Sequence, residues 1–202
     1  MKKFTFLIIS VLLVSNAFQA FAQTQEDLNT FNKERLKIQK TGMGVLGAWA
    51  VGNIAVGVVG AETTSGSVQE LHKMNIIWNG INLALAVPGY IGASKGKYDL
   101  PFRKTYKEQV GAEKTFLFNG GLDVAYILGG LYLVEKSKNA TDLSKHNRYL
   151  GYGNSIMFQG AFLALLDITM YNIHKSHGKR KLDPYLDKIV IGYNGVGFRH
   201  TF

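Results

Sequence analysis

Residues 41–61 read TGMGVLGAWAVGNIAVGVVGA and contain no Asp, Glu, Lys or Arg. Three further apolar runs of similar length follow, over residues 74–94, 115–134 and 149–172. The second run is also free of charge, and the last two carry one aspartate each, Asp123 and Asp167. A helix of about twenty apolar residues matches the thickness of a bilayer. We therefore interpret the four runs as membrane-spanning helices, called spans one to four below.

A water-soluble helical bundle is the alternative to membrane spans. Its helices would carry charged residues on one face at a 3.6-residue period, and the four runs lack such a face. Short connections make successive helices neighbours. The prediction is an all-α fold: an antiparallel four-helix transmembrane bundle, followed by a short C-terminal β-hairpin or an irregular tail.

Residues 1–22 have the pattern of a secretory signal peptide. Lys2 and Lys3 precede an apolar centre, and Ala20-Phe21-Ala22 has the small-x-small pattern of a cleavage site. Cleavage there would remove two of the charges that give the whole sequence its net +9. The leader predicts a cell-envelope protein, in the inner membrane in preference to the outer. An uncleaved first helix is the alternative.

The rest of the chain divides around the spans. Residues 23–40 are predicted to form an amphipathic helix at the membrane surface, and residues 41–174 the four-span domain. A long loop is expected from Lys95 to Lys114, because Pro101 interrupts a helix. Residues 175–202 form a basic linker and tail, in which Asn194-Gly195 between β-forming residues is a hairpin signal.

Composition limits the chemistry and the partners. The sequence has no cysteine, which excludes disulfides, thiolate metal sites and thiol nucleophiles. Its basic residues lie mainly in the connections and near the C-terminus, a distribution suited to anionic lipid headgroups. Membrane lipid and an envelope protein are the expected partners, and nucleic acid is not. We expect no cofactor.

Two patterns within the spans suggest helix packing. The triplets Trp78-Asn79-Gly80, Phe118-Asn119-Gly120 and Phe158-Gln159-Gly160 recur every 40 residues. Gly121, Ala125 and Gly129 are four residues apart and form a small-residue stripe, which would allow a neighbouring helix to approach closely. Chance and shared membrane composition are the alternative explanation of the triplets.

Polar residues inside the spans are the candidate site. A carboxylate in the hydrocarbon costs roughly 2.5–3.5 kcal/mol, so Asp123 and Asp167 should face inward. Two interpretations remain open: these side chains hold the helices together by hydrogen bonds, or they line a polar track for protons, ions or a polar solute. The candidates for this intramembrane track are Asn53, Asn79, Asn82, Asn119, Asp123, Asn154, Gln159 and Asp167.

Catalysis has no support in the sequence. His174 and His177 are three residues apart, but this spacing alone is too loose for a metal site. No phosphate-binding loop or nucleophile motif occurs. We expect a protein that is not an enzyme and has a structural or partner-binding role; a small transporter or channel is the alternative.

Three segments of the sequence look familiar. They are the run from Phe31-Asn32-Lys33-Glu34-Arg35 to Lys40-Thr41-Gly42-Met43, the run Trp49-Ala50-Val51-Gly52-Asn53-Ile54, and residues 122–132 (LDVAYILGGLY). Together they resemble a family of uncharacterised four-helix membrane proteins from Gram-negative bacteria. The resemblance implies a helical membrane protein and supplies no active-site residues.

Two rules disagree on orientation. A cleaved signal places the mature N-terminus, the second loop and the C-terminus outside the cytoplasm. Most Lys and Arg residues lie on that side, whereas the positive-inside rule would place them in the cytoplasm. We give the signal more weight and predict that the C-terminus faces the periplasm.

Overall fold

The computed structural model describes the backbone of residues 2–186, 189–192 and 195–198, and the side chains of residues 25–184. Within these residues the chain forms helices and two short strands. Their bounds are α1 Lys2–Thr63, α2 Gly66–Lys95, α3 Phe102–Lys138, α4 Leu143–Lys181, α5 Asp183–Leu186, β1 Ile189–Gly192 and β2 Gly195–Phe198.

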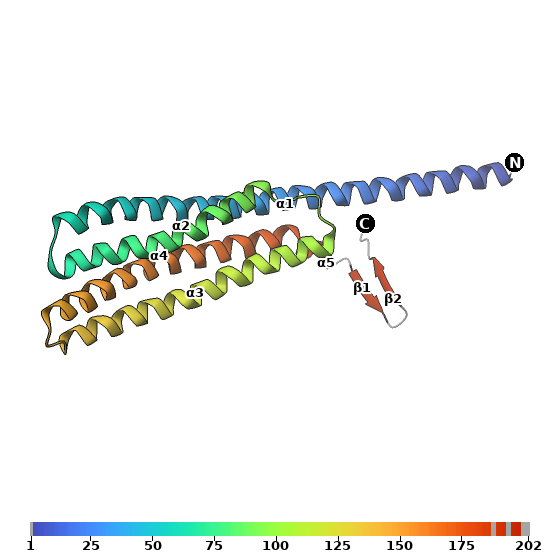
Figure 1. Ribbon diagram of the computed structural model, residues 1–202. Helices are drawn as coiled ribbons and strands as arrows, with labels where there is room; N and C mark the ends of the chain where they lie inside the picture. The colour runs from blue at the N-terminus through green and yellow to red at the C-terminus, as the bar shows by residue number, and fades with distance from the viewer. Residues whose placement is uncertain (1, 187–188, 193–194, 199–202) are drawn as a thin grey trace.

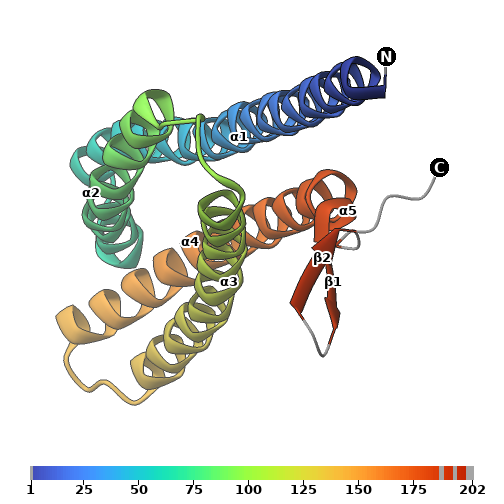
Figure 2. The ribbon, with the colours of Figure 1, turned by 90° about the vertical axis from the view of Figure 1, so that its right-hand side faces the viewer.

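The four long helices form two antiparallel hairpins that pack side by side (Figure 1). α1 packs along α2, α3 packs along α4, and the contact between α2 and α4 joins the two hairpins. Figure 2 shows α1 and α2 on one side of the molecule and α3 and α4 on the other. The predicted all-α bundle of four helices is confirmed.

The helices are longer than the apolar runs, and the connections are shorter than predicted. The loop expected from Lys95 to Lys114 is reduced to residues 96–101, because α3 begins directly after Pro101. Asp142 caps α4, with its Oδ1 accepting a 2.9 Å hydrogen bond from the backbone N–H of Lys145. An apolar run marks a length that fits a membrane, whereas a helix continues until a cap or a proline ends it.

Residues 25–40 do not form a separate surface helix. They continue the axis of span one within α1 and pack along the start of α3 and the end of α4 (Figure 1). Leu28 and Phe31 are almost fully buried against Leu182. These two side chains are therefore covered by protein rather than by a membrane surface.

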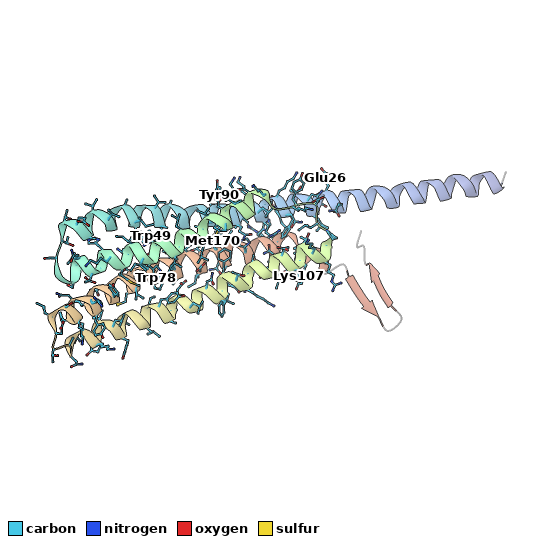
Figure 3. The ribbon with its side chains drawn as sticks, in the orientation of Figure 1. Glu26, Trp49, Trp78, Tyr90, Lys107 and Met170 are labelled. Carbon is cyan, nitrogen blue, oxygen red and sulfur yellow. The ribbon has the colours of Figure 1, made fainter. Side chains whose placement is uncertain are left out.

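Many polar side chains lie inside the bundle, and many apolar side chains lie on its outside. Buried polar or charged residues within the helices include Asn75, Asn79, Asn82, Asp123, Ser155, Gln159 and Asp167. Exposed apolar residues include Val56, Val59, Leu85, Phe118, Leu128 and Leu165. In the part of the chain whose side chains are described, they project outward from all four long helices (Figure 3). All four long helices contain a window apolar enough and long enough to cross a membrane.

The predicted small-residue stripe on span three faces outward, so its expected role in packing this bundle is wrong. Gly121, Ala125 and Gly129 are exposed, and a Cβ added at Gly129 would meet nothing within 4 Å. The close contact between α3 and α4 uses the next residue instead. A Cβ added at Gly130 would lie 2.7 Å from the carbonyl oxygen of Gly153, which leaves no room for a side chain.

The C-terminal segment follows the basic end of α4. β1 and β2 pair in antiparallel register, with Ile191 opposite Val196. Asn194, part of the predicted hairpin turn, lies outside the described residues, as does His200.

Candidate functional site

A network of side-chain amides connects α1, α2 and α4 at the centre of the bundle. Its hub is Gln159 on α4, which is fully buried. The Gln159 Oε1 accepts a 2.8 Å hydrogen bond from the indole Nε1 of Trp49 on α1. Its Nε2 donates to Asn75 Oδ1 on α2 at 3.0 Å and to Asn53 Oδ1 on α1 at 3.3 Å. One side chain therefore bonds to both other helices.

The network continues along α2. Asn75 Oδ1 also accepts a 2.7 Å hydrogen bond from the Ser155 hydroxyl of α4. Asn79 Nδ2 donates to the backbone carbonyl of Asn75 at 2.9 Å, and its Oδ1 accepts from Asn82 Nδ2 at 3.3 Å. Asn75, Asn79 and Asn82 share one face of α2, so the chain of bonds runs lengthwise along the helix to Asn82.

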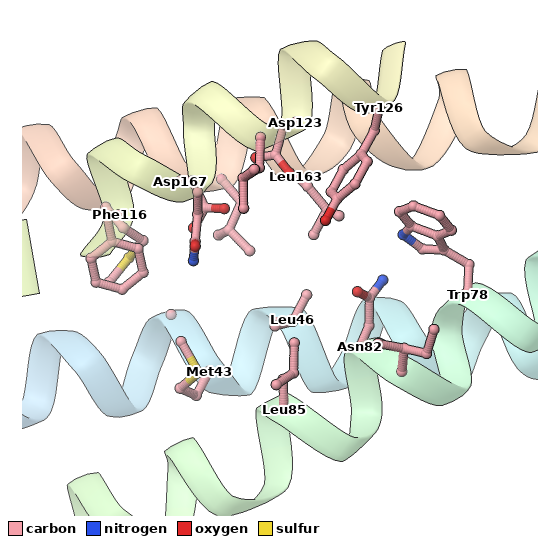
Figure 4. A pocket seen from close by; sticks show the side chains of 16 residues that line it. Met43, Leu46, Trp78, Asn82, Leu85, Phe116, Asp123, Tyr126, Leu163 and Asp167 are labelled. Atoms are coloured by element: carbon pink, nitrogen blue, oxygen red, sulfur yellow. The ribbon is translucent and has the colours of Figure 1, made fainter. Parts of the chain in front are cut away.

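Asn82 also lines a cavity of about 360 Å³ that all four long helices enclose. Apolar and aromatic side chains form most of its wall, among them Leu46, Phe116 and Leu163 (Figure 4). Trp78 on α2 meets Tyr126 on α3 edge to face at its border, with ring centroids 4.9 Å apart. The cavity is therefore mostly apolar, with a few polar groups at defined positions.

Two carboxyl groups enter this cavity from the α3–α4 side (Figure 4). Asp123 of α3 is 3% exposed and Asp167 of α4 is 9% exposed, and the two side chains interact directly. Asp123 Oδ2 is buried without a hydrogen-bond partner. α4 comes close to α3 here because Gly160 lacks a side chain: a Cβ on it would lie 3.1 Å from the Asp123 carbonyl oxygen.

A second polar cluster ties residues 25–40 of α1 to the ends of α3 and α4. Lys181 Nζ lies 2.6 Å from both carboxylate oxygens of Glu34, and His177 Nε2 lies 2.9 Å from Glu34 Oε2. The hydrogen bonds from Lys181, and then from His177, hold the pKa of Glu34 below its ordinary value. Asn32 Nδ2 donates to Thr105 Oγ1 on α3 at 2.7 Å.

The two histidines near the end of α4 lie in different surroundings. His177 stacks on Phe31, with ring centroids 4.3 Å apart. His174 is fully buried, stacks on Phe116 at 5.4 Å, and neither of its ring nitrogens has a hydrogen-bond partner. Among the described residues, no group of three or more His, Asp or Glu side chains is arranged to hold a metal ion.

The structure divides the predicted track into two connected parts and excludes one residue. Asn53, Asn79, Asn82 and Gln159 belong to the amide network. Asn82, Asn119, Asp123 and Asp167 line the cavity. Asn154 is exposed on the outer face of α4, so the structure does not bring it together with the other candidates.

Sequence reasoning missed two members of the site, Trp49 and Ser155. Asn75 is indicated by its i, i+4, i+7 spacing with Asn79 and Asn82 on one face of span two, although it is not among the track candidates above. Trp49 stands four residues before Asn53, whose Nδ2 donates to the Trp49 carbonyl at 2.9 Å. Ser155 carries no signal in the sequence beyond lying four residues before Gln159.

A family model matches more than half of the chain. The model described as "Family of unknown function (DUF6992)" matches residues 45–168. The chain belongs to this family. This match confirms the expected membership of a family without an assigned function. The matched region includes the whole amide network and both carboxyl groups of the cavity. The searches of curated proteins and of solved structures found no match.

Proposed function

We propose that this DUF6992 protein is an integral membrane protein of the bacterial cell envelope with a structural or partner-binding, non-enzymatic role. In a bilayer the outside of the bundle is as apolar as the lipid, so burial of apolar surface gives no drive for helix association. Packing of small residues and hydrogen bonds between helices must then hold the bundle together. The amide network and the Gly130–Gly153 contact supply both.

The observation that carries this proposal is the distribution of polarity. Leu128 on α3 is 60% exposed and Val56 on α1 is 62% exposed, whereas Gln159 and Asn79 are fully buried. A water-soluble bundle has the opposite arrangement, with polar side chains outward and apolar ones inward. Apolar surface along four helices is suited to lipid.

Placement in the cell envelope rests on the leader, residues 1–22. Partner binding rests on the basic connections, which suit anionic headgroups or an acidic protein surface.

Cell fractionation tests the proposal. The full chain with a C-terminal tag is expressed in a Gram-negative host, and the membrane fraction is washed with alkaline carbonate. The protein should stay with the membranes, lose the leader after Ala22 by N-terminal sequencing, and dissolve only in detergent. Recovery in the soluble fraction would overturn the membrane assignment, and an intact leader would overturn the export assignment.

A second candidate function is transport of a proton or a small cation. The buried Asp123 Oδ2 has no hydrogen-bond partner and belongs to a side chain that lines the cavity. Asp123 interacts directly with Asp167. Two interacting carboxyl groups do not both ionise easily and tend to share a proton. The amide network, by contrast, is internally hydrogen-bonded, which favours a packing role for that half of the track.

Flux measurements in proteoliposomes separate the two functions. Transport predicts proton or cation flux that Asp123→Asn and Asp167→Asn reduce, while Asn154→Ala, on the exposed face, leaves it unchanged. A packing role predicts no protein-dependent flux in any of the four proteins.

A further inference from the structure

A second cavity, of about 370 Å³, lies where residues 35–39 of α1 meet the end of α2 and the start of α3. Three cationic side chains line it: Arg35 of α1, Lys97 of the α2–α3 connection and Lys104 of α3. Glu108 is the anionic side chain in its wall. The cavity is therefore a basic pocket, and it lies just before span one and at the end of span two.

Arg35 is the unusual member of this basic pocket, because its side chain is only 4% exposed. Its Nε donates a long 3.3 Å hydrogen bond to Asn32 Oδ1. Its Nη1 lies 3.9 Å from Glu108 Oε2, and the Glu108 side chain is 47% exposed. A buried guanidinium has five N–H donors and needs close anionic partners to offset its desolvation. A long, half-exposed ion pair offsets this cost weakly.

The wall of the basic pocket formed by α2 is made of small residues. Gly89, Gly92, Ala93 and Gly96 line it on successive turns. Gly92 is exposed, and a Cβ placed there would meet nothing within 4 Å. A bound group can thus reach the α2 backbone at Gly92 without meeting a side chain.

The basic pocket adjoins the apolar cavity along both helices. Gln39 of the basic pocket is one turn from Met43 of the apolar cavity, and Gly89 is one turn from Leu85. Leu85 and Ile81 line the apolar cavity and are nevertheless 63% and 56% exposed. The two adjoining cavities, called the crevice below, thus have a cationic end and an apolar side that opens outward.

We propose that this crevice binds one anionic phospholipid, with its phosphate between Arg35, Lys97 and Lys104 and an acyl chain along Ile81 and Leu85. The planar guanidinium of Arg35 would bind two phosphate oxygens at once, and the two lysines would add point charges. The inference rests on the proposed membrane location and names the lipid class and the residues that recognise it.

Native mass spectrometry of detergent-purified protein tests the site. The probes are dioleoyl phosphatidylglycerol, dioleoyl phosphatidylcholine and inorganic phosphate. Wild-type protein should retain one phosphatidylglycerol more tightly than phosphatidylcholine. Lys97→Gln and Lys104→Gln should each weaken phosphatidylglycerol binding by about tenfold, since each removes a charge-assisted contact. Lys107→Gln, an exposed lysine of the same helix that does not line the pocket, should leave it unchanged.

Three results would overturn the proposal. These are equal affinity of wild type, Lys97→Gln and Lys104→Gln; equal binding of the two lipids; and inorganic phosphate competing as well as the lipid does. Arg35→Gln is a weaker test because Arg35 is buried and its loss can unfold the protein, so the exposed lysines decide. Failure of the membrane assignment would appear separately, as recovery of the protein in the soluble fraction.

Discussion

The indole Nε1 of Trp49 and the amide Oε1 of Gln159 form a 2.8 Å hydrogen bond although the residues are 110 positions apart. This bond joins α1 of the first hairpin to α4 of the second. Trp49 also stacks on Phe162 of α4, with ring centroids 3.7 Å apart and planes 3° from parallel. The two hairpins are therefore fixed to each other by a bond and a stack from the same indole.

Gln159→Leu should destabilise the bundle more than any other single change in the amide network. It removes three interhelical hydrogen bonds and leaves Trp49 Nε1 without an acceptor. Hydrogen bonds between membrane helices average about 0.6 kcal/mol each, so we expect a loss of about 2 kcal/mol in the free energy of unfolding. Unfolding in bicelles measures it. Asn154→Leu, on the exposed face of the same helix, should cost nothing; an equal loss in both variants would contradict the packing role.

Gly130→Ala and Gly129→Ala form a matched pair. A Cβ at Gly130 would meet the Gly153 carbonyl oxygen at 2.7 Å and the Met157 backbone nitrogen at 3.0 Å, whereas Gly129 has open space. Forcing two backbones apart costs about 1–3 kcal/mol. Thermal unfolding in detergent should show a lower midpoint for Gly130→Ala alone. Equal midpoints for the two variants would show that α3 and α4 are farther apart at this position.

The pattern of charge predicts the number of helices and their central segments, because a run such as 41–61 is decided by its own residues. Which side a residue faces depends on the neighbouring helix. Asn79 and Asn154 are both amides within spans, yet one is buried and the other exposed. Gly129 and Gly130 differ in the same way. The burial of Phe31 could not be predicted either, since it depends on α4 extending as far as Leu182.

Glu34 should make the protein less stable in acid. Its folded-state pKa is below the ordinary 4.5, chiefly through Lys181. A carboxyl with a lowered folded pKa contributes stability above its unfolded pKa, and that contribution is lost as the pH falls through the folded pKa. Lys181→Gln should therefore lose less stability than wild type between about pH 5 and pH 3. Lys179→Gln, an exposed lysine on the same helix, should follow wild type; if all three proteins respond alike, Lys181 does not hold the Glu34 pKa down.

Asp123→Asn should leave folding nearly unchanged under either function, because an amide can replace a protonated acid in hydrogen bonding. Asp123→Leu enlarges the apolar side of the cavity and removes the partner of Asp167. It should lower the thermal midpoint if the pair packs α3 against α4. A midpoint equal to that of wild type would argue that the carboxyl pair serves the transport candidate.

Orientation can be measured with a reporter fused after Phe202. The C-terminal ends of α2 and α4 lie at the same end of the bundle (Figure 1). One fusion therefore shows on which side of the membrane both helices end. A reporter active only in the cytoplasm should stay inactive. Strong activity would place the C-terminus in the cytoplasm, as the positive-inside rule expects.

The most direct test of the membrane-embedded bundle uses the absence of native cysteine. Leu128→Cys, in the middle of span three, and Leu143→Cys, at the start of α4, are both strongly exposed sites. Each is spin-labelled in liposomes with oxygen and a water-soluble nickel complex present on both sides of the membrane. The label at position 128 should collide with oxygen and hardly with nickel, and the label at 143 should collide readily with nickel. Equal access of nickel to both positions would contradict the account, because the outer face of α3 would then lie in water.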